Sequence, residues 1–375
     1  MAHRDAGRSR FRPGAGAAQI LAALVASWSA TAGAFPARRL APAGTSAAIE
    51  ASPAEGLARS ERPERSRRPE RPTFAAFFER QVAAADPLPQ DVLAAARRYR
   101  YVFVAGFLNE AFRSGYFNEN RDALLAAGVG ADAIHVVFPR SADAVAETAG
   151  HLRQQIPALA GAGPQKLILI GHSKGAAELL AFALGNAAFV RARIEAIFLV
   201  QGAIGGSGVA DYITDAGHPL DDEMPAAARV AFAVAARGGK LLDGQLDRGF
   251  QSLTHRQAAA LWARLVPRQS PSDRIFYVRG HRKPAEVSKI LSLTATYLST
   301  YYGDNDGLVE VEDQWIPGLG RVLATLEADH MALTVARPVS GDGPAVRRAF
   351  TRALLMQLAG ALAPAAASSS PAHVR

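Results

Sequence analysis

The chain of 375 residues is long enough for one large domain or two smaller ones, and its 49% hydrophobic and 20% charged residues are ordinary for a globular protein. Most of the net charge of +8 lies in the first 72 residues, which leaves residues 73–375 nearly neutral and argues against nucleic-acid binding. Because the sequence has no cysteine, it excludes disulfides, thiolate metal sites and a cysteine nucleophile.

The first 72 residues have the composition of targeting and linking segments. Residues 1–34 predict a secretory signal peptide, because four arginines precede an apolar, alanine-rich stretch that ends in the small residues Ala-Gly-Ala. An uncleaved anchor or a mis-assigned start codon is the alternative. Residues 35–72 combine prolines with arginine and glutamate and predict a disordered linker. We therefore expect a secreted or periplasmic protein, with a further flexible tail at 366–375.

Beyond residue 72, short apolar runs alternate with helical segments. The predicted strands are 99–107, 133–138, 166–170, 196–200, 274–278 and 322–326. The predicted helices are 118–127, 142–156 (ending before Pro157), 176–184, 226–236, 255–265 and 345–362. This alternation predicts one α/β domain over 73–365, with a mostly parallel, doubly wound sheet. The helical stretch 212–272 interrupts the rhythm and predicts a cap or lid inserted over the carboxyl ends of the strands.

A glycine-rich turn follows the third predicted strand. Residues 171–175 read Gly-His-Ser-Lys-Gly, with a buried-type apolar run before them and an alanine-rich helix after them. Such a turn holds its serine in a cramped conformation, where the close neighbours must be small. We therefore predict Ser173 as a nucleophile, with the backbone N–H of Lys174 as one oxyanion donor. The Lys174 side chain is expected to point away and to take no part in the chemistry.

A serine nucleophile needs a general base, and the base needs an orienting carboxylate. Where such a turn carries the nucleophile, the chain order is serine, acid, histidine. His330 is the predicted base because it follows the last predicted strand, whereas the other histidines come too early, lie in the cap or tail, or have no suitable acid before them. The turn at 303–309 supplies the acid: Asp306 is favoured because apolar residues follow it, and Asp304 remains the alternative.

The second oxyanion donor is expected in the loop after the first strand. Ala105-Gly106-Phe107 occupies that place, which makes the Phe107 N–H the candidate. The alternative is that Gly106 only permits a tight turn.

Together, these motifs resemble those of the bacterial true lipases and related esterases of the α/β-hydrolase superfamily, over roughly residues 99–335. The family's serine elbow is matched at 171–175, its Gly-x-Pro-x-x-Gly-Ser segment approximately at 202–207, and its Asn-Asp-Gly-Leu-Val turn at 305–309. Two positions depart from the pattern. Ala105 replaces the histidine before the oxyanion glycine, and Ala332 replaces an aspartate that binds structural calcium in many of these lipases, so no calcium site is carried over.

The residues and the resemblance imply a serine hydrolase of carboxylic esters, lipase-like or carboxylesterase-like, acting through an acyl-enzyme and needing neither metal nor cofactor. A thioesterase, a polyester depolymerase or an acyltransferase would use the same residues, and a non-catalytic binding protein of the same fold is the rival from another class. The expected partner is a small-molecule or lipid ester. Transient contact with a lipid surface, the acyl chain length and the oligomeric state stay open.

Overall fold

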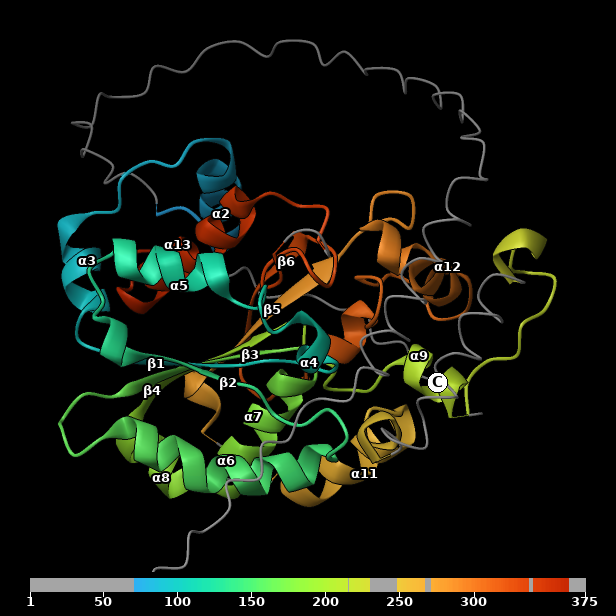
Figure 1. Cartoon of the computed structure of the whole chain (residues 1–375), viewed down its shortest axis with the longest axis horizontal. Coiled ribbons are helices and arrows are strands. Elements are labelled where there is room, and N and C mark those ends of the chain that lie inside the picture. Colours follow the sequence, from blue (N-terminus) through green and yellow to red (C-terminus); the bar gives the residue numbers. More distant parts are fainter. Residues whose placement is uncertain (1–70, 215, 230–247, 267–270, 337–339, 364–375) are drawn as a thin grey trace, which may run out of the picture.

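The computed structural model describes residues 71–214, 216–229, 248–266, 271–336 and 340–363. Its centre is a six-stranded, fully parallel sheet in the order β2-β1-β3-β4-β5-β6 (Figure 1). The strands are β1 (Arg100–Val104), β2 (Ile134–Val137), β3 (Leu167–His172), β4 (Ile194–Val200), β5 (Ile275–His281) and β6 (Arg321–Glu327). Every residue of β3 is buried. Such continuous apolar strands form because helices cover both faces of the sheet.

Two groups of helices cover the two faces and bury separate hydrophobic clusters (Figure 1). One face carries α2 (Phe74–Ala83), α3 (Gln90–Ala96), α5 (Asn118–Ala126) and α13 (Pro344–Leu358). The other carries α6 (Val145–Ala160), α7 (Lys174–Gly185), α8 (Ala187–Arg193) and α11 (His255–Leu265). The connections contain α4 (Asn109–Phe112), α9 (Gly208–Ile213), α12 (Ser292–Tyr301) and the 3-10 turns η2 (Ala131–Ala133), η3 (Ser272–Arg274), η4 (Lys289–Leu291) and η5 (Val311–Gln314).

The strand order determines where a ligand can bind. β1 lies between β2 and β3, so the chain winds one way from β1 to β2 and the other way from β3 onward. In open parallel sheets, ligands bind outside the carboxyl ends of the strands at such a switch point. Phe107, Ser173 and His330 follow the carboxyl ends of β1, β3 and β6, and therefore lie along this edge of the sheet.

The first and last described segments of the chain are joined. Helix α2 packs on α13, with the rings of Phe74 and Phe350 6.4 Å apart between centroids. The Ala363 N–H donates to the Pro72 carbonyl at 2.9 Å, and the Arg71 guanidinium donates to the Gly360 carbonyl at 2.6 Å. The two ends of the described α/β domain are thus in direct contact with each other.

The predicted fold class is confirmed. Each predicted strand overlaps an observed strand, and their ends differ by at most three residues. Three helix boundaries were wrong: α6 begins at Val145 and not at 142, and it continues through Pro157 to Ala160, while α13 ends at Leu358 and not at 362. Pro157 is exposed, whereas Ile156 and Ala160 are buried on the core face of the helix. The free energy gained by burying that face exceeds the cost of the one backbone hydrogen bond that the proline removes near the helix end.

Several predicted segments lie partly or wholly outside the described residues. These are the signal peptide, nearly all of the linker, all of the tail at 366–375, and helix 226–236 beyond its helical residues 226–229. Within the predicted cap, α11 packs against α7, and Gly249 and Phe250 lie beside Phe107.

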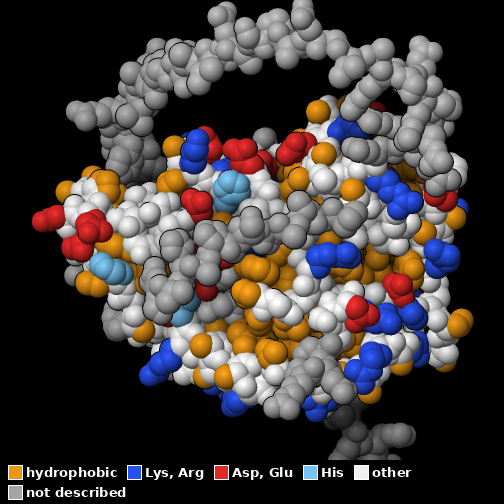
Figure 2. Space-filling model, turned by 180° about the vertical axis from the view of Figure 1, so that it is seen from behind, with side chains coloured by type: hydrophobic (Ala, Val, Ile, Leu, Met, Phe, Trp, Pro, Cys, Tyr) orange, Lys and Arg blue, Asp and Glu red, His pale blue; other side chains and the backbone are white. Residues whose placement is uncertain are grey.

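No helix among the described residues combines the length and apolar character needed to cross a bilayer. Acidic and basic side chains are interspersed around a central area of hydrophobic ones on the face seen in Figure 2.

Candidate active site

Ser173 occupies the tight turn between β3 and α7 and has a strained backbone. Its φ of 57° and ψ of −128° lie in a region that residues with a side chain rarely adopt. The Ser173 N–H donates to the Val200 carbonyl at 3.1 Å, and the Ser173 carbonyl accepts from the Ala176 and Ala203 N–H groups. These bonds to β4 and α7 hold the strained residue in place. Ser173 is 8% exposed, at the carboxyl edge of the sheet.

Glycines around Ser173 are required by close backbone contacts. A Cβ at Gly171 would lie 2.7 Å from the Gly175 carbonyl oxygen, and one at Gly175 would lie 2.6 Å from the Ala105 carbonyl oxygen. A Cβ at Gly106 would lie 2.6 Å from that of Ser173. Because real Cβ atoms do not approach so closely, Gly171 lets the start of α7 pack on the turn, and Gly175 lets the turn pack on the end of β1. Gly106 brings the loop after β1 directly against the serine.

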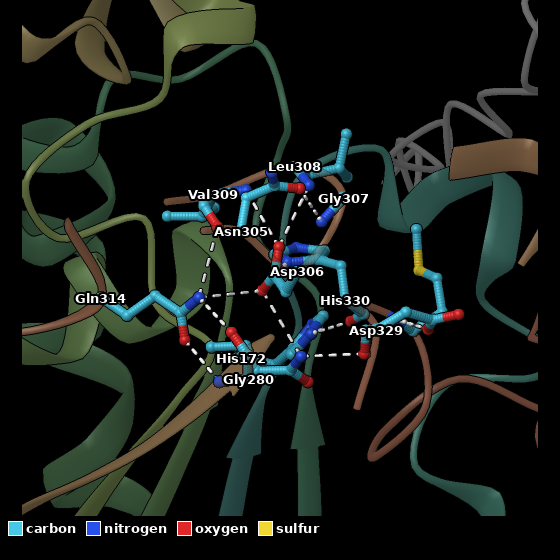
Figure 3. A network of polar contacts seen from close by, with 12 residues as sticks. His172, Gly280, Asn305, Asp306, Gly307, Leu308, Val309, Gln314, Asp329 and His330 are labelled. Carbon is cyan, nitrogen blue, oxygen red and sulfur yellow. Dashed lines mark hydrogen bonds and ion pairs between the residues drawn. The ribbon is translucent and has the colours of Figure 1, made fainter. Parts of the chain in front are cut away.

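The Asp306 carboxylate and the His330 imidazole are in buried contact. His330 Nδ1 lies 2.8 Å from Asp306 Oδ2, and the His330 N–H donates to the Asp306 carbonyl at 2.8 Å (Figure 3). Asp306 is fully buried and His330 is 2% exposed. With Nδ1–H donating to the carboxylate, Nε2 is left without a proton. That is the tautomer a general base needs.

The Asp306 carboxylate is surrounded by hydrogen-bond donors that the sequence does not predict. Its Oδ1 accepts from the Leu308 and Val309 N–H groups at 3.0 and 2.9 Å. Its Oδ2 also accepts from the side-chain amides of Gln201 at 3.4 Å and Gln314 at 3.3 Å. Gln201 also holds the His330 loop, because its amide donates to the Asp329 carbonyl at 2.8 Å. Neither glutamine stands at a fixed spacing from a motif, so no sequence signal marks it.

His172 and Tyr116 connect the oxyanion loop to the His330 loop. Tyr116 Oη accepts from the Gly106 N–H at 3.0 Å and lies 2.6 Å from His172 Nδ1, and His172 Nε2 lies 2.8 Å from the His330 carbonyl oxygen. Burial raises the pKa of Tyr116, and burial beside His330 lowers the pKa of His172 well below its ordinary value. Both groups therefore stay neutral, with His172 donating from Nε2. Tyr116 thus supplies a side-chain hydrogen bond to the oxyanion loop, in which Ala105 has no polar side chain.

The two predicted oxyanion donors belong to segments that adjoin Ser173. Lys174 is the first residue of α7, so its N–H is one of the free donors at a helix start. Within the described ranges, the Phe107 N–H has no hydrogen-bond acceptor. The loop is held in place at the next residue, where the Leu108 N–H donates to Ser141 Oγ at 2.7 Å. The Phe107 ring packs edge-on against Phe250, with centroids 4.6 Å apart.

The other charged side chains near the site have different surroundings. Asp304 is exposed on the turn before Asp306. Asp329 is buried but accepts from the Ser288 N–H and hydroxyl at 2.7 and 2.5 Å, so it anchors the His330 loop. The Lys174 side chain is buried and paired with Glu178 one turn along α7.

Comparison with known proteins agrees with this architecture. A metagenomic carboxyl esterase matches 73% of this chain and 79% of its own, at 22% identity and a TM-score of 0.54. The chain has the α/β-hydrolase fold. No family model matches the chain, and no curated protein matches it in sequence.

Two further structures with the α/β-hydrolase fold are more distant. A mature lipase of Bacillus licheniformis matches 62% of this chain and 85% of its own, at 16% identity and a TM-score of 0.45. A thioesterase from the prodiginine pathway of Streptomyces coelicolor matches 74% and 94%, at 16% identity and a TM-score of 0.33. The assignment of the α/β-hydrolase fold rests on the esterase and on the sheet topology.

Proposed function

We propose that this protein is a serine hydrolase that cleaves carboxylic esters through an acyl-enzyme. One observation carries the proposal: the buried contact of 2.8 Å between His330 Nδ1 and Asp306 Oδ2, at the sheet edge where Ser173 stands in a strained elbow. A serine hydroxyl, a carboxylate and an imidazole, in this order along the chain, form the arrangement that activates a serine for acyl transfer.

In the proposed reaction, Ser173 Oγ attacks the ester carbonyl carbon while His330 Nε2 takes the hydroxyl proton. The tetrahedral intermediate collapses, the carbon–oxygen bond to the alcohol breaks, and His330 returns the proton to the leaving alcohol. Water then attacks the acyl-enzyme with His330 again as the base, which releases the carboxylic acid and restores Ser173. Asp306 keeps the imidazole in the required tautomer and stabilises the imidazolium that forms twice in each cycle.

The negative charge that develops on the carbonyl oxygen requires donors that are already in place. The backbone N–H groups of Phe107 and Lys174 are proposed for this role, supported by the close approach of Gly106 to Ser173 and by the start of α7 behind the nucleophile. Removing one such donor costs about 10²–10³ in kcat in serine hydrolases, so the position of this loop matters to the rate.

Fluorophosphonate labelling tests the nucleophile. The probe reacts only with an activated serine, so wild type should be labelled and Ser173→Ala should not. Ser272→Ala is the matched control, because Ser272 is exposed in η3, just before the amino end of β5. Absence of labelling in wild type, or equal labelling of Ser173→Ala, would exclude the proposed serine chemistry.

The acyl group is tested with p-nitrophenyl esters of increasing chain length beside an acyl thioester. We propose a small-molecule or lipid ester as the substrate. A maximum at short chains would indicate an esterase and one at long chains a lipase. Faster turnover of the thioester than of every oxygen ester would replace the proposed substrate class by thioesters.

We also propose that the protein is exported, on the basis of the arginines and the apolar run within residues 1–34. N-terminal sequencing of the mature protein from its native host should find a start shortly after residue 34. A mature protein that retains these residues in the cytoplasm would contradict export.

A further inference from the structure

Four ionisable side chains gather beside, but not within, the candidate active site. Asp211 lies in α9, His255 is the first residue of α11, and Glu310 and Asp313 follow the turn that carries Asp306. Ligand-type atoms of His255, Glu310 and Asp313 all lie within 4.8 Å of one another. Three carboxylates thus surround a single imidazole.

Glu310 is the member of this group that internal pairing does not satisfy. Its side chain is buried, at 4% exposure, and its Oε1 accepts from the Gly208 N–H at 2.9 Å. Its Oε2 is buried with no hydrogen-bond partner among the described residues. A buried carboxylate oxygen without a donor is costly, and here it belongs to a side chain directed at His255 and Asp313.

Asp211 fixes the orientation of His255. Asp211 Oδ2 lies 2.5 Å from His255 Nδ1, and Oδ1 accepts from the His255 N–H at 3.0 Å. The imidazole also stacks on the Tyr302 ring, with an interplanar angle of 9°. These contacts leave Nε2 facing Asp313 Oδ2 at 3.2 Å. A carboxylate that holds one imidazole nitrogen while the other faces carboxylate oxygens is the usual surrounding of a metal-binding histidine.

The glycine-rich loop after β4 is shaped around the same residues. A Cβ at Gly206 would lie 2.7 Å from the His255 backbone, one at Gly208 would lie 2.7 Å from Glu310 Oε1, and one at Gly205 would overlap the Asp313 carboxylate. Gly206 also has a φ of 122°, which favours glycine. The loop therefore has glycines where the His255 backbone and the Glu310 and Asp313 carboxylates come close to it.

We propose that His255, Glu310 and Asp313 bind one divalent metal ion, Zn²⁺ by its ligand chemistry, with Asp211 as the residue that positions His255. Imidazole nitrogen with carboxylate oxygens suits Zn²⁺, whereas Ca²⁺ and Mg²⁺ prefer oxygen ligands alone. Ligand atoms about 2.0–2.1 Å from a tetrahedral zinc ion lie about 3.4 Å apart. The observed 3.2 Å between His255 Nε2 and Asp313 Oδ2 matches that spacing, and a small movement of Glu310 would complete it.

The charges of the group agree with a cation. The carboxylates of Asp211, Glu310 and Asp313 lie around the single His255 imidazole, which is too little positive charge to neutralise all three. The site is also reachable, because the His255 and Asp313 side chains are 30% and 27% exposed.

The proposed ion would act on structure rather than on the reacting atoms. It would join the start of α11, which Asp211 ties to α9, to the segment after the Asp306 turn. The same segment supplies the Leu308 and Val309 N–H groups that hold the Asp306 carboxylate. The proposal therefore stands or falls separately from the ester hydrolase proposal.

Calorimetric titration of tag-free, chelator-treated full-length protein with Zn²⁺ tests the site, with Ca²⁺ and Mg²⁺ titrated in parallel. Wild type should bind one Zn²⁺ per chain in preference to the other two ions, with a rise in Tm. Glu310→Gln and Asp313→Asn should abolish the saturable binding. Asp211→Asn should weaken it about 10- to 100-fold, as loss of an orienting residue does at other metal sites.

Glu312→Gln is the matched control. Glu312 lies between two proposed ligands, but its side chain is 72% exposed and faces Arg279, so this variant should bind Zn²⁺ like wild type. Circular dichroism establishes that each variant is folded. If Glu310→Gln does not fold, Asp313→Asn, at the more exposed position, is the ligand variant to compare with Glu312→Gln. The proposal is overturned if wild type shows no saturable Zn²⁺ binding, if it prefers Ca²⁺, or if the ligand variants bind as tightly as Glu312→Gln.

Discussion

At the scale of single residues, the Asp306 carboxylate has both oxygens occupied by donors, and Asp304 two positions earlier is exposed. Asp306→Asn would place an amide against His330 Nδ1 and favour the wrong imidazole tautomer. We expect kcat for an ester substrate to fall about 10⁴-fold, as it does in serine hydrolases that lose this carboxylate. Asp304→Asn, the matched change, should leave kcat near the wild-type value. A full rate in Asp306→Asn with a loss in Asp304→Asn would assign the acid to Asp304.

Tyr116 is the second residue whose removal has a specific consequence. Tyr116→Phe would leave the Gly106 N–H and His172 Nδ1 buried without a partner, at a cost of about 1–3 kcal/mol in the free energy of unfolding. Because Gly106 precedes the proposed donor Phe107, we also expect kcat to fall, by up to about 10²-fold. Steady-state kinetics and urea unfolding measure the two effects.

Tyr101→Phe is the control for that experiment. Tyr101 is equally buried, but its hydroxyl donates to the Ala96 carbonyl at the far end of β1. Its loss should reduce stability and leave kcat unchanged. If both variants lowered kcat alike, the effect of Tyr116 would be general destabilisation and not positioning of the oxyanion loop.

At the scale of elements, α7 contains an ion pair with almost no exposure to water. The Lys174 and Glu178 side chains are 1% and 0% exposed, and burial raises the pKa of Glu178 to about 6 although the Lys174 ammonium opposes the shift. Glu178→Gln would leave a buried ammonium without its counter-charge. We expect a loss of about 3–5 kcal/mol in the free energy of unfolding, measured by urea denaturation.

The surface pair of Lys166 and Glu195 provides the comparison. Its Nζ–Oε2 distance is 2.8 Å, but the two side chains are 39% and 36% exposed. Glu195→Gln should therefore cost at most about 1 kcal/mol. Equal losses in Glu178→Gln and Glu195→Gln would mean that water reaches the α7 pair.

The elements also differ in how well their sequences predicted them. The strands and α5, α7, α11 and α13 were found because a clear apolar run or periodicity coincides with start and stop residues. Helix α12 was not assigned. Its sequence Ser-Leu-Thr-Ala-Thr-Tyr-Leu-Ser-Thr-Tyr is rich in β-branched and aromatic residues that favour strands, and burial of residues such as Tyr297 and Leu298 overrides that preference. Helix α2 was also not predicted. Its three buried phenylalanines pack on α13, which comes from the other end of the chain, so their burial depends on the folded structure.

The candidate site divides in the same way. Ser173, Asp306 and His330 were predicted because chain order and local motif are visible in the sequence, and the structure brings Asp306 and His330 together. Gln201 and Gln314 donate hydrogen bonds to the Asp306 carboxylate from segments that only the folded sheet brings close to it. Proximity of that kind depends on the folded topology, so spacing along the chain carries no sign of it.

At the scale of the whole molecule, stability should depend on pH through His172. In the unfolded chain this histidine binds a proton near pH 6.5, whereas in the folded protein burial and the neighbouring His330 keep its pKa well below that value. Between the two values the unfolded state binds more protons, so the free energy of unfolding should fall as the pH drops below about 6.5. One proton corresponds to a slope of about 1.4 kcal/mol per pH unit.

His172→Gln removes this titration, and urea unfolding at several values between about pH 5 and pH 7 measures the change. The variant should be less stable than wild type at neutral pH, because its contacts with Tyr116 and the His330 carbonyl are altered. Its stability should also decline less steeply towards acid. An unchanged slope would mean that His172 becomes protonated without unfolding the protein.

The contact between α2 and α13 has a topological consequence. Because the Ala363 N–H is bonded to the Pro72 carbonyl, a short peptide could connect the two described ends without displacing either helix. New termini could then open in the exposed turn at 161–164, between α6 and β3. In such a circular permutant Ser173 would come near the start of the polypeptide, with the order of strands in the sheet unchanged. The sequential order of serine, acid and histidine would then survive, while the oxyanion loop moved from before the nucleophile to after the base.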